Sequence, residues 1–490
     1  MSTPSPPTLA RDPKLVRLDS FLYRHRVAEV MRGPVVTVAP DTSLAEASRA
    51  MIRERIGSLV VADAEGRAVG IATERDFLRA LAEMGSNAAD APISRIMSGP
   101  VETIIEDAAL FVAMGRMPRL GINHLVVVDG RGLPVGVISA STLMRLRSAE
   151  TLIVGDEVAA ADGAAALAAV WRRMPALVVA LRAERVEGLG ATAVISSIVR
   201  EMTARAAELA EQSMADAGWG APPARWCVLV LGSGGRGESA LIPDQDNAIV
   251  HAGSESDDAW FAEAGRRIAE TLDQAGIPLC KGGVMAKNAA WRRSLADWEQ
   301  EVERWIRKKE GKELLNVDIF FDCAPVHGDR TLAAELRRHA IAAAGRSPLF
   351  LRLLAAELEN RGSALGLFGF LRTQQGRFDI KLGGFLPIVT AARVMALKHG
   401  VDALGTGERL AELAQRNAVN ADDAANLVRA YGFLIQQLLV QQTADIAAGL
   451  KPSTRVDPRH LHPALKPALK SALRLADLAA EIVRGALSRG

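Results

Sequence analysis

The sequence has little of what several classes of protein need. It contains only 3 cysteines and 4% aromatic residues, and no uninterrupted apolar run reaches the roughly 18 residues that a membrane-spanning helix requires. Cys227, Cys280 and Cys323 form no CxxC pair, which disfavours a disulfide framework and a cysteine zinc site. The net charge is +2, so no excess of positive charge indicates DNA binding. These absences predict a soluble, cytoplasmic protein that binds neither DNA nor a membrane.

What the chain does contain is an internal repeat with a period of 66 residues. A shift by this period aligns, without a gap, VMRGPV at 30–35 with IMSGPV at 96–101 and LVVAD at 59–63 with LVVVD at 125–129. Apolar residues such as Leu44, Ala47 and Met51 recur at helical spacing, and β-branched segments flank an Asp-x-x-Gly turn. The repeat predicts two copies of one small unit of strands and helices.

The repeat is similar to a pair of CBS domains over residues 27–148. Its most specific part is GIATERD, in which Thr73 ends a strand and Asp76 follows in the next helix. The resemblance implies a regulatory adenine nucleotide whose ribose and phosphate bind at Thr73, Asp76 and, in the second copy, Ser139. That copy has Thr142 where the aspartate would be, so we expect at most one good ribose site, in the first copy. A pair that serves only packing or dimerisation is the alternative.

A glycine-rich loop ends the apolar segment CVLVLGSGGRGE at 227–238. Backbone amides of such a loop can approach an anion closely. The glycines have P-loop spacing, and Ser239 supplies the hydroxyl of that motif, but Glu238 stands where the motif needs a lysine. A carboxylate at the position that must bind the β- and γ-phosphates excludes a P-loop. The glycines also satisfy the GxGxxG dinucleotide fingerprint. Because Pro243 interrupts the following helix and the crossover is short, this second interpretation is the weaker one.

Asp244 and Asp246 follow the loop and precede the next apolar segment. Alternate residues of an extended chain point to one face, so the two carboxylates are expected side by side. A divalent cation bound by one or two carboxylates and triphosphate oxygens relieves their repulsion. The pattern favours a polymerase-β-type nucleotidyltransferase with Mg²⁺ or Mn²⁺, in which Gly232, Ser233 and Arg236 hold the phosphates of an NTP. A solvated acidic turn is the alternative.

A third catalytic and metal-binding carboxylate is expected from a neighbouring strand, predicted at residues 314–322. Asp318 and Asp322 both lie in this segment, and on a regular strand they would face the same side. At least one of the two is expected only to cap the end of the strand.

Together these motifs resemble CBS-pair proteins that carry a DUF294-type nucleotidyltransferase domain, relatives of the protein-PII uridylyltransferase module. The matching residues are GS at 232–233, RGE at 236–238, DQDN at 244–247, CKGGVM at 280–285, Trp291 and Trp298, FFD at 320–322, DIK at 379–381 and Arg393. The resemblance makes Asp322 the first choice for the third metal ligand and Asp318 the second, and it implies that Lys381 reaches the nucleotide. The chain departs from the family at Ser239, Pro243 and Ala324.

Between these motifs, five apolar residues recur at the spacing of one helix face: Trp291, Leu295, Trp298, Val302 and Trp305. Such a stripe favours a core helix over a base-stacking site.

The sequence therefore predicts a multidomain α+β protein. Its expected parts are an N-terminal tail at 1–26, a CBS domain pair at 27–150, a helical connector at 151–220, a polymerase-β-like nucleotidyltransferase domain at 221–345 and a C-terminal helical domain at 346–490. The expected function is CBS-regulated, metal-dependent transfer of NMP from an NTP to an acceptor hydroxyl, with a protein among the candidate acceptors. A signalling protein that binds nucleotides without transferring them is the alternative. CBS pairs associate, so a homodimer is also expected.

Overall fold

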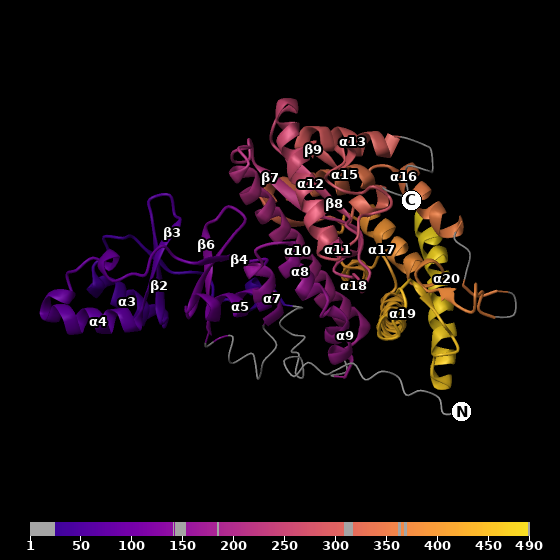
Figure 1. Cartoon of the computed structure of the whole chain (residues 1–490), viewed down its shortest axis with the longest axis horizontal. Helices are drawn as coiled ribbons and strands as arrows, with labels where there is room; N and C mark the ends of the chain where they lie inside the picture. Colours follow the sequence, from indigo (N-terminus) through magenta and orange to yellow (C-terminus); the bar gives the residue numbers. More distant parts are fainter. Residues whose placement is uncertain are drawn as a thin grey trace. The chain divides into compact units, whose positions relative to one another are not determined.

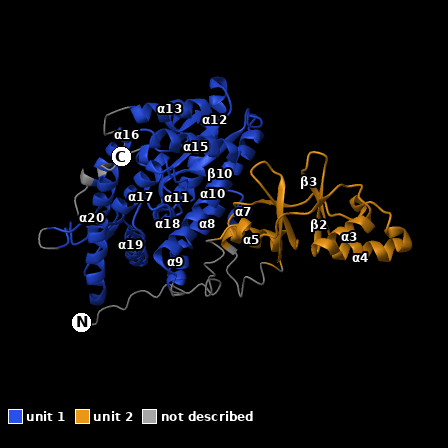
Figure 2. Cartoon of the chain, turned by 180° about the vertical axis from the view of Figure 1, so that it is seen from behind, with its two compact units in different colours: residues 1–20, 157–490 blue, residues 21–156 orange. Residues whose placement is uncertain are grey.

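The computed structural model describes residues 25–140, 142, 153–183, 186–307, 317–360, 364–366 and 370–488. They belong to two compact units, one within residues 21–156 and the other including residues 157–490 (Figures 1 and 2). Helix α7 (Ile153–Ala160) links the two units in the sequence.

The smaller unit contains two copies of one α/β motif. In each copy, a short strand pairs in parallel with the next strand, which pairs antiparallel with the third. The strands are β1 (Thr37–Val38), β2 (Ser58–Ala62) and β3 (Ala68–Thr73) in the first copy, and β4 (Thr103–Ile105), β5 (His124–Val128) and β6 (Pro134–Ser139) in the second. The helices are α2 (Val27–Val30), α3 (Leu44–Glu54), α4 (Glu74–Met84) and α5 (Leu110–Leu120). Equivalent elements lie 66 residues apart, which confirms the predicted repeat.

The two copies pack through equivalent faces. Val60 and Val126 occupy the same position in the repeat, and both are completely buried in one cluster with Ile71. A second cluster lies beneath the helices of the first copy and includes Leu59 and Ile93. Burial of these β-branched and aliphatic side chains holds the copies together as one unit.

The larger unit is built around a four-stranded sheet in the order β10-β7-β8-β9. Its strands are β7 (Trp226–Val230), β8 (Asn247–His251), β9 (Arg292–Ser294) and β10 (Ala324–Gly328). β7 pairs antiparallel with β8 and β10, whereas β9 runs parallel to β8. Helices α12 (Asp258–Gln274), α13 (Leu295–Arg307) and α15 (Arg330–Gly345) contact these strands. Every residue of β7 and β8 is buried, as expected at the centre of a sheet covered on both faces.

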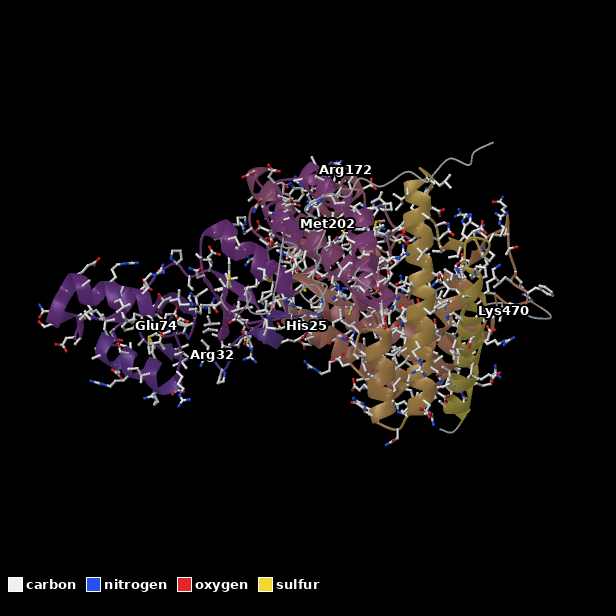
Figure 3. All side chains as sticks on the ribbon, turned by 90° about the horizontal axis from the view of Figure 1, so that it is seen from below. His25, Arg32, Glu74, Arg172, Met202 and Lys470 are labelled. Carbon is white, nitrogen blue, oxygen red and sulfur yellow. The ribbon has the colours of Figure 1, made fainter. Side chains whose placement is uncertain are left out.

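The predicted connector forms the helices α8 (Ala164–Trp171), α9 (Met174–Ala183) and α10 (Gly188–Asp216). α10 packs against α12 and against α19 (Ala421–Ala447), so it belongs to the larger unit (Figure 1). Its Met202 is completely buried (Figure 3). Residues 164–182 are apolar and long enough to cross a membrane by length and composition alone, a test that a core helix also passes.

The C-terminal region is helical, as predicted. Its helices are α16 (Pro348–Asn360), α17 (Leu386–Lys398), α18 (Thr406–Gln415), α19 and α20 (Lys466–Ser488), and its two-stranded sheet is β11 (Phe378–Asp379) with β12 (Arg455–Val456). A π-helical turn, Lys381–Phe385, leads into α17. Residues 387–397 of α17 are buried on all sides, which makes it the central helix of this region.

The strand predicted at 314–322 is wrong for the residues that the structure describes. Residues 317–320 are helical and are followed by a turn, and the strand β10 begins only at Ala324. The start of the predicted segment, 314–316, lies outside the described residues. An apolar run of this length fits a buried helical turn as well as a buried strand, so its pattern did not distinguish them.

The tryptophan stripe forms part of the core, as expected. Trp298 on α13 is completely buried, and its ring centroid lies 6.1 Å from that of Trp291, 6.0 Å from that of Trp305 and 5.0 Å from that of Phe320. Trp291 differs from the prediction because it ends a 3₁₀ turn, Ala289–Trp291, before β9 instead of joining the helix.

Candidate active site

The glycine loop forms a single short helix, α11 (Gly232–Arg236), between β7 and the acidic segment. Gly232 has a φ of +58°, and a Cβ there would lie 3.1 Å from the carboxylate Oδ2 of Asp246. A Cβ on Gly235 would lie 1.6 Å from the backbone oxygen of Asp322. Glycine is therefore required at both positions because the loop passes directly against two acidic segments.

The segment 244–247 alternates between buried amides and more exposed carboxylates. Gln245 donates from Nε2 to the backbone oxygens of Ala269 at 3.1 Å and Ile277 at 2.6 Å, and the Oδ1 of Asn247 accepts from Ala286 N at 2.8 Å. The side chain of Asp244 is exposed and that of Asp246 is half-buried. The side chains of Gln245 and Asn247 are bound in the interior. Because alternate side chains of an extended segment point to opposite sides, Asp244 and Asp246 face the other way.

Asp246 lies at the centre of a group of charges. Burial raises the pKa of Asp246 to about 6, and the nearby carboxylate of Asp244 adds to the rise. A hydrogen bond with the thiol of Cys280 and the positive charges of Lys381 and Arg236 oppose it. The structure thus brings the aspartate pair, the CKGGVM loop and the C-terminal Lys381 into one electrostatic neighbourhood.

Asp322 is held by three arginines. Its side chain is completely buried, and it accepts hydrogen bonds from Arg236 Nη1 at 2.6 Å, Arg393 Nη2 at 2.5 Å and Arg409 Nη1 at 2.7 Å. Although burial alone raises the pKa of a carboxylic acid, Arg393, Arg409 and Arg236 hold the pKa of Asp322 well below its usual value.

The structure therefore gives Asp322 three arginines as partners, where a metal ion was predicted. Its carboxylate oxygens face guanidinium groups, and a cation would have to displace them. Asp318, the second choice, accepts a hydrogen bond from Nη1 of the same Arg393 at 2.7 Å. Within the described part of the chain, no group of three or more His, Cys, Asp or Glu residues is arranged to hold a metal ion. Asp244 and Asp246 are left as a two-carboxylate pair.

Arg236 also differs from the prediction. Its Nε donates to Glu238 Oε2 at 2.6 Å and its Nη1 donates to Asp322, and only 8% of its side chain is exposed. The guanidinium stabilises the loop from the interior of the protein, with its hydrogen bonds directed at these two carboxylates. Ser233 stays a candidate: it is half-buried, and its Oγ lies 3.5 Å from that of Ser239.

Sequence reasoning missed how Glu238 fastens the loop to the C-terminal helices. The buried Glu238 accepts hydrogen bonds from Thr406 N at 2.5 Å, Thr406 Oγ1 at 3.0 Å and the hydroxyl of Tyr431 at 2.8 Å. The RGE motif includes Glu238, but nothing in the sequence indicated that Thr406 and Tyr431 are its partners. Arg409 was missed for the same reason, because a lone arginine on a helix is ordinarily an exposed residue.

In the smaller unit, the first CBS motif forms a helix cap. Asp76 Oδ2 accepts from Thr73 N at 2.9 Å, which is one half of the capping box of α4, and also from Thr73 Oγ1 at 2.7 Å. In the second copy, the hydroxyls of Ser139 and Thr142 lie 2.9 Å apart.

A cavity of about 490 Å³ adjoins the second motif, although we expected the better site at the first. Its lining includes Arg32, Glu54, Ser58, His124, Ser139 and Thr142 (Figure 3 labels Arg32). His124 lines the cavity, and burial lowers its pKa, although the charge of Asp76 opposes this shift.

Comparison with protein families finds three matches in chain order. The CBS domain matches residues 27–83 and 93–149, "Putative nucleotidyltransferase DUF294" matches 172–312, and "Putative nucleotidyltransferase substrate binding domain" matches 348–486. The chain belongs to the CBS-pair proteins with a DUF294 nucleotidyltransferase domain. The DUF294 match begins at residue 172, so it includes α10, in agreement with the packing of that helix.

This DUF294 protein is also similar to shorter segments of other proteins. An uncharacterised 17.7 kDa protein of Acidianus ambivalens is 32% identical over 120 residues, which are 24% of this chain and 71% of that protein. Inosine-5′-monophosphate dehydrogenase of Mycobacterium tuberculosis is 34% identical over 110 residues, which are 22% of this chain and 20% of the enzyme. The chain spans 71% and 61% of two small curated relatives, but a quarter or less of the similar enzymes.

Two solved structures are similar to about a quarter of the chain. A CBS domain protein from Pyrobaculum aerophilum, complexed with AMP, is 29% identical and covers 25% of this chain and 98% of its own, with a TM-score of 0.23. A CBS-domain protein from Agrobacterium tumefaciens is 29% identical and covers 25% of this chain and all of its own, also with a TM-score of 0.23.

Proposed function

We propose that the protein transfers NMP from an NTP to an acceptor hydroxyl, using Mg²⁺ or Mn²⁺ bound by Asp244 and Asp246. The observation that carries the proposal is the contact between the glycine loop and the acidic segment, where a Cβ on Gly232 would lie 3.1 Å from Asp246. A triphosphate bound along the loop lies next to the two carboxylates. This is the arrangement that metal-dependent nucleotidyl transfer needs.

The aspartate pair fits a divalent cation. Two like-charged carboxylates lie close enough for Asp244 to raise the pKa of Asp246, and a cation would replace this repulsion by attraction. Magnesium is held in proteins by one or two carboxylates plus substrate phosphates, so the pair suffices without Asp322. The bound cation would neutralise charge on the phosphates. Ser233 and the backbone amides of the loop would hold the outer phosphates, and Lys381 would add positive charge beside them.

The acceptor is proposed to bind the C-terminal helices, because the family match names this region a substrate-binding domain. Resemblance to the protein-PII uridylyltransferase module supports a protein hydroxyl as the acceptor. The Lys381–Phe385 turn is suited to face both substrates, since Lys381 belongs to the C-terminal region and its charge acts on Asp246.

One observation favours a second function, a signalling protein that binds nucleotides without transferring them. The third carboxylate expected in an active polymerase-β-type site, Asp322, is bound by three arginines. A site with two carboxylates retains the means to bind a metal–nucleotide complex even where transfer fails.

The CBS pair is proposed to bind a regulatory adenine nucleotide. The cavity beside Ser139 and Thr142 supports this proposal, since its volume of about 490 Å³ suits a small organic ligand. The pair is also proposed to form a homodimer through α3 and α4, where Ile52, Leu78 and Leu81 are 77%, 69% and 59% exposed. Light scattering checks the dimer: Leu78→Asp should dissociate it, whereas Leu450→Asp on the other unit should not.

The transferase is tested with the purified full chain, Mg²⁺ or Mn²⁺, each α-labelled NTP and a cell lysate as the source of acceptors. Asp246→Asn and Asp244→Asn should reduce labelling about a hundredfold or more, because metal-ion charge stabilisation contributes several kcal/mol. Asp273→Asn, the same change at an exposed position of α12, should label normally. A wild-type chain that binds NTPs but labels nothing in the lysate would overturn the transferase in favour of the nucleotide-binding protein.

A further inference from the structure

Helix α10 holds the glycine loop directly. Arg200 on this helix donates from Nε to the backbone oxygen of Gly234 at 2.7 Å and from Nη2 to that of Gly235 at 2.5 Å. One turn earlier on the same face, the Oγ of Ser196 accepts a hydrogen bond from the backbone N of Ser239 at 2.7 Å. The loop is thus bound to α10 at two places, at Gly234 and Gly235 and again at Ser239.

The contacts of Arg200 add to the few hydrogen bonds that the loop makes within itself, where Gly234 O also accepts from Gly237 N at 3.2 Å. The last carbonyls of any helix lack partners in that helix, and α11 has only five residues. The guanidinium of Arg200 donates to Gly235 O and gives Gly234 O a second donor, and it interacts favourably with the negative end of the peptide dipoles. Arg200 therefore determines the orientation of the peptide groups of the loop.

The loop is packed so closely against its neighbours that it has little room to move. A Cβ on Gly234 would lie 2.6 Å from the side chain of Val230, and one on Gly235 would lie 1.6 Å from the backbone of Asp322. A displacement of the loop by a few tenths of an ångström also moves Gly232 relative to the Asp246 carboxylate. Arg200 binds the loop at Gly234 and Gly235, close to Gly232, so it helps to fix the distance between the backbone of Gly232 and the carboxylate of Asp246.

We propose that Arg200 is a positioning residue for the nucleotide loop and that α10 sets the geometry of the phosphate site through it. The inference rests on the proposed nucleotide function of the loop. It assigns a role to a residue outside the glycine and aspartate motifs. Because Arg200 belongs to α10 and α10 packs within the larger unit, the proposal makes this helix part of the support of the phosphate site.

The test compares Arg200→Gln and Arg200→Lys with a matched control on the same helix. Arg205 also donates from Nε to a backbone carbonyl, that of Ala161 at 2.8 Å, and pairs with Glu208, but it does not contact the loop. Hydrogen exchange of peptides covering residues 231–241 measures the loop without any nucleotide. Loss of two charge-assisted hydrogen bonds should speed this exchange about tenfold or more in Arg200→Gln, less in Arg200→Lys, and not in Arg205→Gln.

A second measurement is the KM for the labelled NTP and its dissociation constant with Mg²⁺. We expect both to rise about tenfold in Arg200→Gln, with partial recovery in Arg200→Lys and no change in Arg205→Gln. Unchanged loop exchange in Arg200→Gln overturns the inference, and so does an equal effect of Arg205→Gln. If the loop exchanges faster in Arg200→Gln but the wild-type protein binds no NTP, the proposed function is contradicted, while the structural role of Arg200 stands.

Discussion

The guanidinium of Arg393 binds the carboxylate of Asp322, although the two residues are 71 positions apart in the sequence. Arg393 comes from α17, the central helix of the C-terminal region, and Asp322 from the turn before β10. Arg409 on α18 binds the same carboxylate. The C-terminal helices therefore supply the counter-charges for the core of the nucleotidyltransferase domain, and the two regions share one buried network.

We predict that Asp322→Asn destabilises the whole larger unit. Removing one partner from a buried ion pair costs about 3–5 kcal/mol, because the remaining charges stay buried without compensation. Here three arginines would lose their shared anion. Urea denaturation gives the free energy of unfolding, and no metal or nucleotide is needed for the effect.

Asp402→Asn is the control for this prediction. Asp402 pairs with Arg337 at 2.5 Å, but its side chain is 77% exposed, so its loss should cost at most about 1 kcal/mol. If Asp322→Asn were as stable as the wild type and had lost only its response to Mg²⁺, the structural role of Asp322 would be refuted.

Gly232→Ala is predicted to impair nucleotide binding beyond its effect on folding. An alanine at φ +58° carries about 1–2 kcal/mol of backbone strain, and its Cβ would lie 3.1 Å from Asp246 Oδ2, which must then shift. Gly400→Ala has nearly the same backbone strain, at φ +62°, but a Cβ there meets no atom within 4 Å. Gly232→Ala should therefore lose at least as much stability as Gly400→Ala.

Titration with Mg²⁺ and each NTP separates the two effects. Gly232→Ala should bind about tenfold more weakly than Gly400→Ala if the displaced carboxylate is a metal ligand. Equal affinities in the two variants would show that the contact between the loop and Asp246 is unimportant for binding.

The part of the fold that could be predicted from the sequence is the part that depends on local pattern. The 66-residue repeat placed the CBS elements correctly because each copy carries its own periodicity, as α3 and α5 show. The segment before β10 failed because Val317, Ile319 and Phe320 are apolar residues that suit a buried strand or a buried helix equally.

The candidate site divides in the same way. The alternation of Asp244 and Asp246 is a local property of an extended chain, and it was predictable. The environment of Asp322 depends on Arg393 and Arg409, which are 71 and 87 positions away, and no spacing rule connects them. Arg200 was unpredictable for the same reason, because its partners are backbone carbonyls that have no identity in the sequence.

His124 should make the stability of the CBS unit depend on pH. Burial lowers the pKa of His124 in the folded protein, although the charge of Asp76 opposes the shift. The unfolded chain takes up this proton at a pH near about 6.5, where the folded protein still resists it. The contribution of neutral His124 to the free energy of unfolding is therefore fully present above that pH and is lost as the pH falls below it.

Calorimetry of the full chain at pH 7.5 and pH 5.5 measures this effect. The melting temperature of the CBS unit should fall less on acidification in His124→Gln than in the wild type, whereas the exposed His460→Gln should behave as the wild type does. The other charged groups lining the cavity, Arg32 and Glu54, are the same in all three proteins, so they cancel in the comparison. An equal fall in His124→Gln and the wild type would contradict the assignment.

The second CBS motif should gain affinity for AMP when its missing carboxylate is restored. Thr142 lines the cavity, and its hydroxyl lies 2.9 Å from that of Ser139. In Thr142→Asp a carboxylate can accept hydrogen bonds from both ribose hydroxyls, and bonds to a charged group contribute about 1.5–3 kcal/mol. Calorimetric titration should therefore show AMP binding about tenfold to a hundredfold tighter than in the wild type.

The ribose hydroxyls provide the control for this gain. With 2′-deoxy-AMP, which lacks one of the two donors, the gain of Thr142→Asp should largely disappear. Asp76→Thr makes the reverse change at the first motif, whose carboxylate already caps α4 through Thr73. If AMP occupies the cavity beside Ser139, Asp76→Thr should leave its affinity within about twofold of the wild type. A large loss in that variant would instead locate the nucleotide at the first motif, where the sequence alone had led us to expect it.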